Sequence, residues 1–267
     1  MRKVGKVKTS AKRGFTLIEV MIFLAITGLL LVGALGGTYT SIANQRYNDS
    51  VRGFAEFFRQ LYSEVISPES LGAGNSNDEA IYGKAVVFGL ETPPGTPDDD
   101  RDHTVYTVTL VGDVEIPDSS DTFVEELKKV NAHFFCGINN GSDYQDSTVS
   151  RYTPLWGTKV RTTNLQPFRG TVIIARSPTS GMVHTAFTSD TFDIKSECTP
   201  DDDYASTAFK NYLINMTNQF SSRTEIDFCL ESDNSRIIRD VRLGEGGRNT
   251  SAVSIIEDNP GETRCFR

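Results

Sequence analysis

The apolar and polar positions divide the chain into three stretches. Residues 1–14 are basic without an acidic side chain, residues 15–37 form an apolar stretch in which Glu19 is the one charge, and the rest alternates in short runs. The 23 residues of the apolar stretch make roughly 35 Å of helix, enough to cross a hydrocarbon core of about 30 Å. Because positive charges flanking a span stay in the cytoplasm, the pattern predicts a single membrane span with a large exported domain.

Beyond the span, apolar side chains recur at spacings of four and three, which predicts that the helix continues with one apolar face. This aromatic stripe comprises Tyr47, Val51, Phe54, Phe58, Leu61 and Val65, and Pro68 marks its end. We expect one helix from Phe15 to about Ser67. The stripe covers under three heptads, so we favour packing on the exported domain over a coiled coil. Arg52 and Glu56 form a helix-spaced pair on the polar face.

Residues 68–267 predict a mainly antiparallel β domain, and the fold class is therefore α+β. Strands are expected at 84–90, 104–111, 131–136, 171–176, 182–187, 224–231, 235–243 and 251–257. Short helices are expected at 121–130 and 204–216. Turn residues between apolar runs predict two hairpins, one joining 171–176 to 182–187 and the other joining 226–230 to 236–238.

The junction of the first two stretches reads Lys12-Arg13-Gly14-Phe15-Thr16-Leu17-Ile18-Glu19-Val20. It closely resembles the class III signal of type IV pilins and of the pseudopilins of type II secretion. The resemblance implies that prepilin peptidase cuts between Gly14 and Phe15 and methylates the Phe15 amine. It also implies a pilin-like fold, with one long N-terminal helix on a β-rich head. Hydropathy alone leaves a secretory signal or an uncleaved anchor as the alternative.

Glu19 is the one carboxylate of the apolar stretch, and a charge there costs roughly 3 kcal/mol at the centre of an inserted helix. After cleavage it is the fifth residue, about one helical turn from the Phe15 amine. We expect the amine of an incoming subunit to pair with the Glu19 carboxylate of its neighbour, which removes the lone buried charge and favours assembly.

Four glycines, at positions 28, 33, 36 and 37, lie in the apolar helix. Each costs about 1 kcal/mol relative to alanine, which favours local unwinding of the kind common in assembled pili. Close helix packing through small residues explains them equally well, and the sequence leaves both alternatives open.

The chain has 27 basic residues, and removal of the leader takes away 6 of them. The remaining 21 basic residues against 35 acidic ones give a formal charge of −14. Such a domain repels DNA phosphates. A group of arginines toward the C-terminus leaves DNA binding open as a weaker alternative to solvated, acid-paired strand faces. They are Arg236, Arg239, Arg242, Arg248, Arg264 and Arg267.

Four cysteines, all on the exported side, indicate disulfides rather than metal or redox chemistry. They are Cys136, Cys198, Cys229 and Cys265. Of the three connectivities we favour Cys136 with Cys198 and Cys229 with Cys265, the latter fastening the C-terminal tail to a strand.

No catalytic residue or cofactor is predicted, because the chain has no nucleophile elbow and no phosphate loop. The three histidines, His103, His133 and His184, lack metal-ligand spacing. The acidic runs 98–102 and 201–203 raise calcium binding as an alternative, but neither has the alternating ligand pattern. We favour solvated loops for both, and predict no metal.

The sequence therefore predicts a structural subunit of a type IV pilus, either a major or a minor pilin, supporting adhesion, twitching motility or DNA uptake. A pseudopilin of type II secretion is the alternative, and a membrane-anchored exported binding domain is a weaker one. The expected partners are other pilin subunits, prepilin peptidase, the inner-membrane assembly platform and, before assembly, the membrane. The precursor is expected in the inner membrane with its head outside the cytoplasm.

Overall fold

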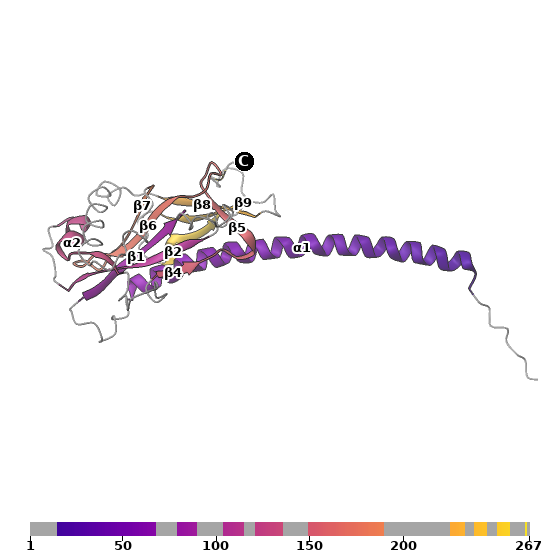
Figure 1. Ribbon diagram of the computed structural model, residues 1–267, viewed down its shortest axis with the longest axis horizontal. Helices are drawn as coiled ribbons and strands as arrows, with labels where there is room; N and C mark the ends of the chain where they lie inside the picture. Colours follow the sequence, from indigo (N-terminus) through magenta and orange to yellow (C-terminus); the bar gives the residue numbers. More distant parts are fainter. Residues whose placement is uncertain are drawn as a thin grey trace, which may run out of the picture. The chain divides into compact units, whose positions relative to one another are not determined.

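The chain divides into two units, Met1–Gln45 and Arg46–Arg267, and each is considered by itself. The computed structural model describes residues 15–67, 79–89, 104–114, 121–135, 149–189, 225–232, 238–244, 250–256 and 265. Helix α1, Leu17–Ile66, is 50 residues long and contributes to both units (Figure 1). It confirms the long N-terminal helix expected from the sequence.

Two antiparallel sheets make up the described β structure of the second unit. The first has the strand order β3-β2-β1-β6-β7, with β4 also pairing with β2, and the second has the order β10-β9-β8-β5. The strands are β1 Glu79–Phe88, β2 Val105–Asp113, β3 His133–Phe135, β4 Val149–Tyr152, β5 Thr158–Arg161, β6 Gly170–Arg176, β7 Val183–Thr188, β8 Ile226–Ser232, β9 Ile238–Leu243 and β10 Val253–Ile256. Together with α1, the sheets give the pilin-like α+β architecture that the sequence predicts.

Both predicted hairpin pairings are confirmed, because β6 pairs with β7 and β8 with β9, each antiparallel. The expected helix at 121–130 is α2, Phe123–Lys129, and Thr122 and Glu125 form a capping box at its start. The helix expected at 204–216 lies outside the described residues. Strands β4 and β5 were not predicted. A short 3₁₀ turn, Leu155–Gly157, joins them and carries the chain from one sheet to the other.

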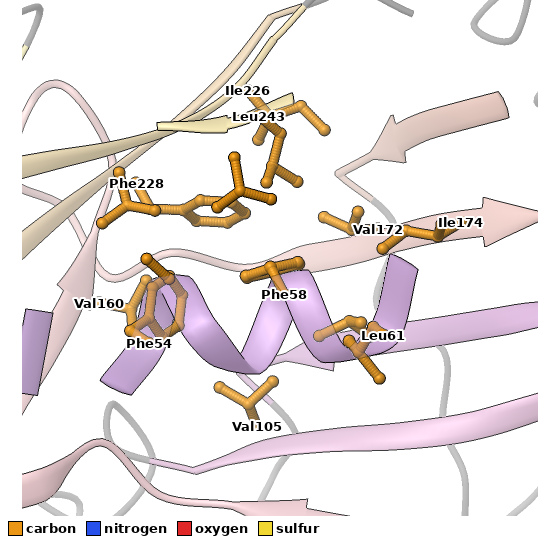
Figure 2. Packing of buried hydrophobic residues seen from close by; sticks show 14 of the residues in the cluster. Phe54, Phe58, Leu61, Val105, Val160, Val172, Ile174, Ile226, Phe228 and Leu243 are labelled. Carbon is orange, nitrogen blue, oxygen red and sulfur yellow. The ribbon is translucent and has the colours of Figure 1, made fainter. Parts of the chain in front are cut away.

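The aromatic stripe of α1 is buried in the main core of the second unit. All six of its side chains are at most 4% exposed, and Figure 2 shows Phe54 and Phe58 facing Phe228 of β8. The Phe58 and Phe228 rings stack with centroids 5.2 Å apart, and Phe54 meets Phe228 edge to face at 5.4 Å. The stripe therefore packs on the chain's own domain, as we favoured, rather than in a coiled-coil seam.

The first sheet is buried on both faces. In β6, Val172 and Ile174 belong to the main core, whereas Ile173 and Ala175 face a second core beneath α2. Because side chains alternate along a strand, a sheet covered on both sides needs an uninterrupted apolar run, and β6 reads Thr-Val-Ile-Ile-Ala.

Three polar contacts tie α1 to both sheets. The Tyr47 hydroxyl donates to the Leu230 carbonyl at 2.6 Å, and the Tyr62 hydroxyl shares a hydrogen bond with Thr185 Oγ1 at 2.7 Å. The Arg59 guanidinium donates to the Val253 carbonyl at 3.1 Å. Burial raises the pKa of Tyr62 to about 12, although the Thr185 hydrogen bond acts in the opposite direction.

The polar face of α1 differs from the sequence prediction in one ion pair. Glu56 pairs with Arg59, three residues along the helix, rather than with the predicted partner Arg52. Both spacings bring side chains together on a helix, so the sequence alone does not separate them.

Candidate functional site

The N-terminal half of α1 presents apolar side chains on every face. The large ones from Phe15 to Ile42 are all exposed, from 45% at Val20 to 81% at Phe15. This helix is long and apolar enough to cross a membrane by length and composition. An apolar surface of this extent is not stable in water, so it requires a bilayer or other helices around it.

Hydroxyl groups in this segment are satisfied by the helix itself. Thr27 Oγ1 donates to the Phe23 carbonyl at 2.7 Å, Thr38 Oγ1 to Leu35 at 2.9 Å, and Thr40 Oγ1 to Gly36 at 3.2 Å. Because an unpaired polar group in hydrocarbon costs several kcal/mol, such internal bonds make the threonines compatible with an apolar surrounding.

The predicted processing and assembly residues lie at the start of α1. Phe15 and Glu19 are exposed, and Gly14 lies outside the described residues. The Glu19 amide donates to the Thr16 carbonyl at 3.1 Å, which places the carboxylate in the first turn of the helix. A negative charge there is favoured by the helix dipole and lies close to the amine that cleavage would create. Pairing with the amine of another subunit stays a prediction.

The four glycines of the apolar segment have no packing reason within the described chain. A Cβ built on Gly28, Gly33, Gly36 or Gly37 meets nothing within 4 Å. All four lie in regular helix. Local unwinding and close packing against another helix therefore both remain open.

A cation–π contact that the sequence did not predict lies at the beginning of the second unit. The Arg46 guanidinium of α1 lies over the indole of Trp156, 4.6 Å from the ring centroid. Trp156 belongs to the turn between β4 and β5, and its backbone is left-handed at φ 60° and ψ 31°. The sequence signal was available, since Trp156 is the one tryptophan of the chain and follows Pro154-Leu155.

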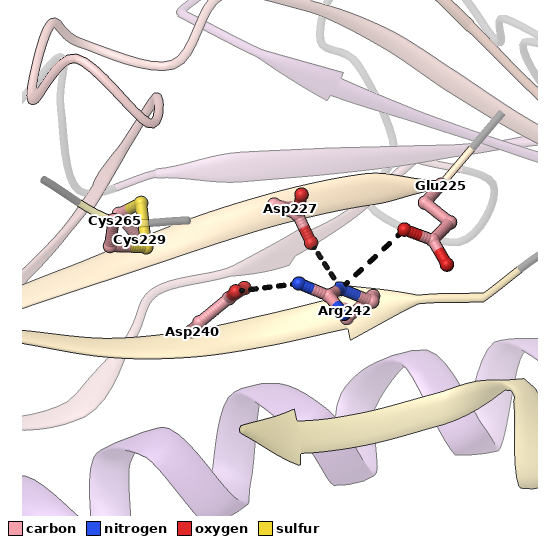
Figure 3. Close-up of polar contacts among 6 residues, drawn as sticks. All are labelled: Glu225, Asp227, Cys229, Asp240, Arg242 and Cys265. Carbon is pink, nitrogen blue, oxygen red and sulfur yellow. Dashed lines mark hydrogen bonds and ion pairs between the residues drawn. A yellow bond between two sulfur atoms is a disulfide. The ribbon is translucent and has the colours of Figure 1, made fainter. Parts of the chain in front are cut away.

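The arginines considered for DNA binding are partly accounted for by acidic partners. Arg242 of β9 contacts Asp227 at 2.5 Å, Asp240 at 3.3 Å and Glu225 at 4.0 Å (Figure 3). Burial lowers the pKa of Arg242, but the hydrogen bond and charge of Asp227, with the other two acids, raise it above its ordinary value. Arg239 is half-buried. The other four arginines lie outside the described residues.

Cys229 and Cys265 form a disulfide with a Cα–Cα distance of 5.6 Å and a sequence separation of 36. This is the pairing that the sequence analysis favoured, and it fastens residue 265 to β8 beside the Arg242 cluster (Figure 3). Closing a loop of that length stabilises a fold by roughly 4 kcal/mol through the unfolded state. Cys136 and Cys198 lie outside the described residues.

The histidines and acidic runs add no chemistry where the structure describes them. His184 stacks on Phe123 with ring centroids 4.2 Å apart, and His133 Nδ1 lies 3.0 Å from the Asn131 carbonyl. Within the described ranges no group of histidine, cysteine or acidic residues is arranged to hold a metal. His103 and the acidic runs at 98–102 and 201–203 lie outside those ranges.

Residues 9–35 match the family model of the prokaryotic N-terminal methylation motif. The chain therefore carries the class III signal of type IV pilins and pseudopilins, as its junction sequence indicated. The chain matches no curated protein and no solved structure. The motif supports a pilin or pseudopilin, points to a structural subunit rather than an enzyme, and implies processing by prepilin peptidase and assembly with other subunits. Together with α1, it fits an inner-membrane precursor that is later assembled.

Proposed function

We propose that the chain is a structural subunit of a type IV pilus. Cleavage after Gly14 and methylation of Phe15 convert a single-pass precursor into a monomer whose apolar helix enters the filament. The observation that carries the proposal is the methylation motif at residues 9–35. It lies directly on a helix whose large apolar side chains are exposed from Phe15 to Ile42.

Mass spectrometry of the mature protein tests the processing step. We expect an N-terminal peptide that begins at Phe15 and carries one methyl group on its amine. A secretory signal would instead give an N-terminus beyond the apolar segment, and an uncleaved anchor would retain the leader. Either of these masses contradicts the proposal.

Glu19→Ala tests the assembly step. We expect the variant to insert and to be processed, while its yield in sheared filaments falls by at least about tenfold, which corresponds to only 1.4 kcal/mol of lost pairing. Glu56→Ala is the matched control, because it removes an acid from the exposed face of the same helix. Normal filaments from Glu19→Ala would exclude the pairing.

A pseudopilin of type II secretion is the second candidate, because the same motif serves both classes. Recovery of the chain in sheared extracellular filaments supports the pilus. Retention in the envelope, together with loss of protein secretion on deletion, supports the pseudopilus. Adhesion, twitching and DNA uptake are then distinguished by the phenotype of a deletion strain.

A further inference from the structure

The turn that joins the two sheets exposes two large apolar side chains. Leu155 is 52% and Trp156 54% exposed. A left-handed backbone is uncommon for a bulky residue and costs of order 1 kcal/mol or more. The fold therefore holds its one tryptophan outside the core, in a backbone conformation that an unconstrained chain avoids.

Arg46 completes this surface. Its exposed side chain places a guanidinium over the indole face, an arrangement worth roughly 0.5–1 kcal/mol at an exposed site. Arg46, Leu155 and Trp156 together, here termed the Trp156 patch, combine a cation, an amphipathic ring and an aliphatic side chain at one place.

This patch lies where the chain enters the second unit, because Arg46 is the first residue of that unit. Arg46 follows Gly37, the last residue of the apolar stretch, by nine residues. Nine residues span at most about 30 Å even when fully extended. The head of a membrane-inserted precursor is therefore tethered to the bilayer at this patch.

We propose that the Trp156 patch docks on the lipid headgroups of the membrane in which the precursor is inserted. The inference rests on the membrane-inserted precursor of the proposed function. Tryptophan and arginine are the side chains that favour this layer, and the Arg46 cation complements lipid phosphates. The rest of the mature chain is acidic and is repelled by anionic lipid, so a local cation determines which surface of the head meets the membrane.

The single tryptophan makes the contact directly measurable. The full chain is reconstituted at one molecule per nanodisc, in phosphatidylcholine and phosphatidylglycerol, with or without a nitroxide on the lipid headgroup. We expect the headgroup nitroxide to lower Trp156 emission by about twofold or more, and a nitroxide at mid-chain depth to have little effect. Arg46→Gln should reduce the quenching in anionic discs and leave it little changed in neutral ones.

The matched control moves the reporter to another exposed position of the same head. Trp156→Phe combined with Met182→Trp places the indole beside the β6–β7 turn, where Met182 is 39% exposed. Circular dichroism verifies its fold, and headgroup quenching should be absent. Equal quenching at both positions overturns the proposal. So does a Trp156 signal that changes only on filament assembly, which assigns the patch to a second copy of the chain.

Resistance of the same samples to alkaline carbonate extraction reports membrane insertion separately. Loss of insertion contradicts the proposed function. Insertion without headgroup quenching contradicts only the docking of the Trp156 patch.

Discussion

Arg242 is the cation around which the C-terminal strands concentrate their negative charge. Its Asp240 partner is fully buried, and Asp227 is nearly so. A carboxylate in such a position must keep its cation, because removal of one member of a buried pair leaves an uncompensated charge. The arrangement explains why an arginine that suggested DNA binding from the sequence serves the fold instead.

Arg242→Met should therefore destabilise the domain by about 3–5 kcal/mol at neutral pH. Urea unfolding of the full chain in detergent measures the loss. Glu56→Ala breaks an exposed ion pair and should cost under about 1 kcal/mol. Equal losses for the two variants would contradict this account of Arg242.

Tyr62 makes stability sensitive to alkaline pH. Burial raises its pKa to about 12, whereas the unfolded phenol ionises near 10. The folded state therefore keeps its proton longer, and its advantage is complete below pH 10 and is lost between about pH 10 and 12. Tyr62→Phe should flatten this part of the stability curve, as followed by urea unfolding at successive pH values. A slope identical to that of the unmodified chain would contradict the prediction.

At the scale of elements, the sequence predicted the helix and the hairpins whose apolar residues recur at regular spacing within one continuous segment. The stripe from Tyr47 to Val65 and the hairpins β6–β7 and β8–β9 have regular apolar spacing and clear turns. Strands β4 and β5 are four residues each and flank Pro154-Leu155-Trp156-Gly157, so no alternation is long enough to identify them. Their partners, β2 and β8, are distant in the chain, and such pairing is determined by packing.

The residues of the candidate site also differ in how far the sequence could predict them. Phe15 and Glu19 were identifiable because the methylation motif is a contiguous run of residues. The Arg46–Trp156 contact was not, because it joins α1 to a turn between two unpredicted strands. The one tryptophan of the chain was the available signal, and it did not indicate a partner.

Two glycines of the second unit should respond oppositely to alanine. A Cβ at Gly53 of α1 would lie 3.6 Å from the Tyr152 hydroxyl, an ordinary contact. Gly53→Ala should therefore stabilise by about 0.5–1 kcal/mol through helix propensity. At Gly83, beside a register shift in β1, a Cβ would overlap the Ile174 carbonyl at 2.3 Å.

Gly83→Ala should accordingly destabilise by about 1–3 kcal/mol, because β6 must move to admit the methyl group. Thermal unfolding of the two variants beside the unmodified chain measures the difference in sign. Destabilisation by both substitutions would show that the contact between α1 and β4 is tighter than the structure indicates.

At the scale of the whole molecule, the core belongs to one of the two units. Among the residues that the structure describes, every buried apolar residue of both cores lies between Tyr47 and Val253, within the unit Arg46–Arg267. The apolar half of α1 contributes to neither core. The unit Arg46–Arg267 thus has the interior that independent folding requires.

A chain that begins at Arg46, exported to an oxidising compartment, should fold with a melting temperature within about 3 °C of the full chain in detergent, since no core contact is removed. A chain that begins at Glu69 lacks the aromatic stripe and should not fold cooperatively. Differential scanning calorimetry distinguishes them. Loss of cooperative melting in the longer chain would show that the first half of α1 stabilises the head.

The two residues joined by the hydrogen bond between Tyr47 and the Leu230 carbonyl are synthesised at different times. They are 183 residues apart, and synthesis proceeds at roughly 5–20 residues per second. The stripe of α1 therefore emerges about 10–40 s before the strand that covers it. The apolar segment that precedes the stripe has by then been synthesised and is suited to the bilayer. During that interval the aromatic side chains lack the strand that buries them, so we expect a holding chaperone to bind the nascent head at this helix.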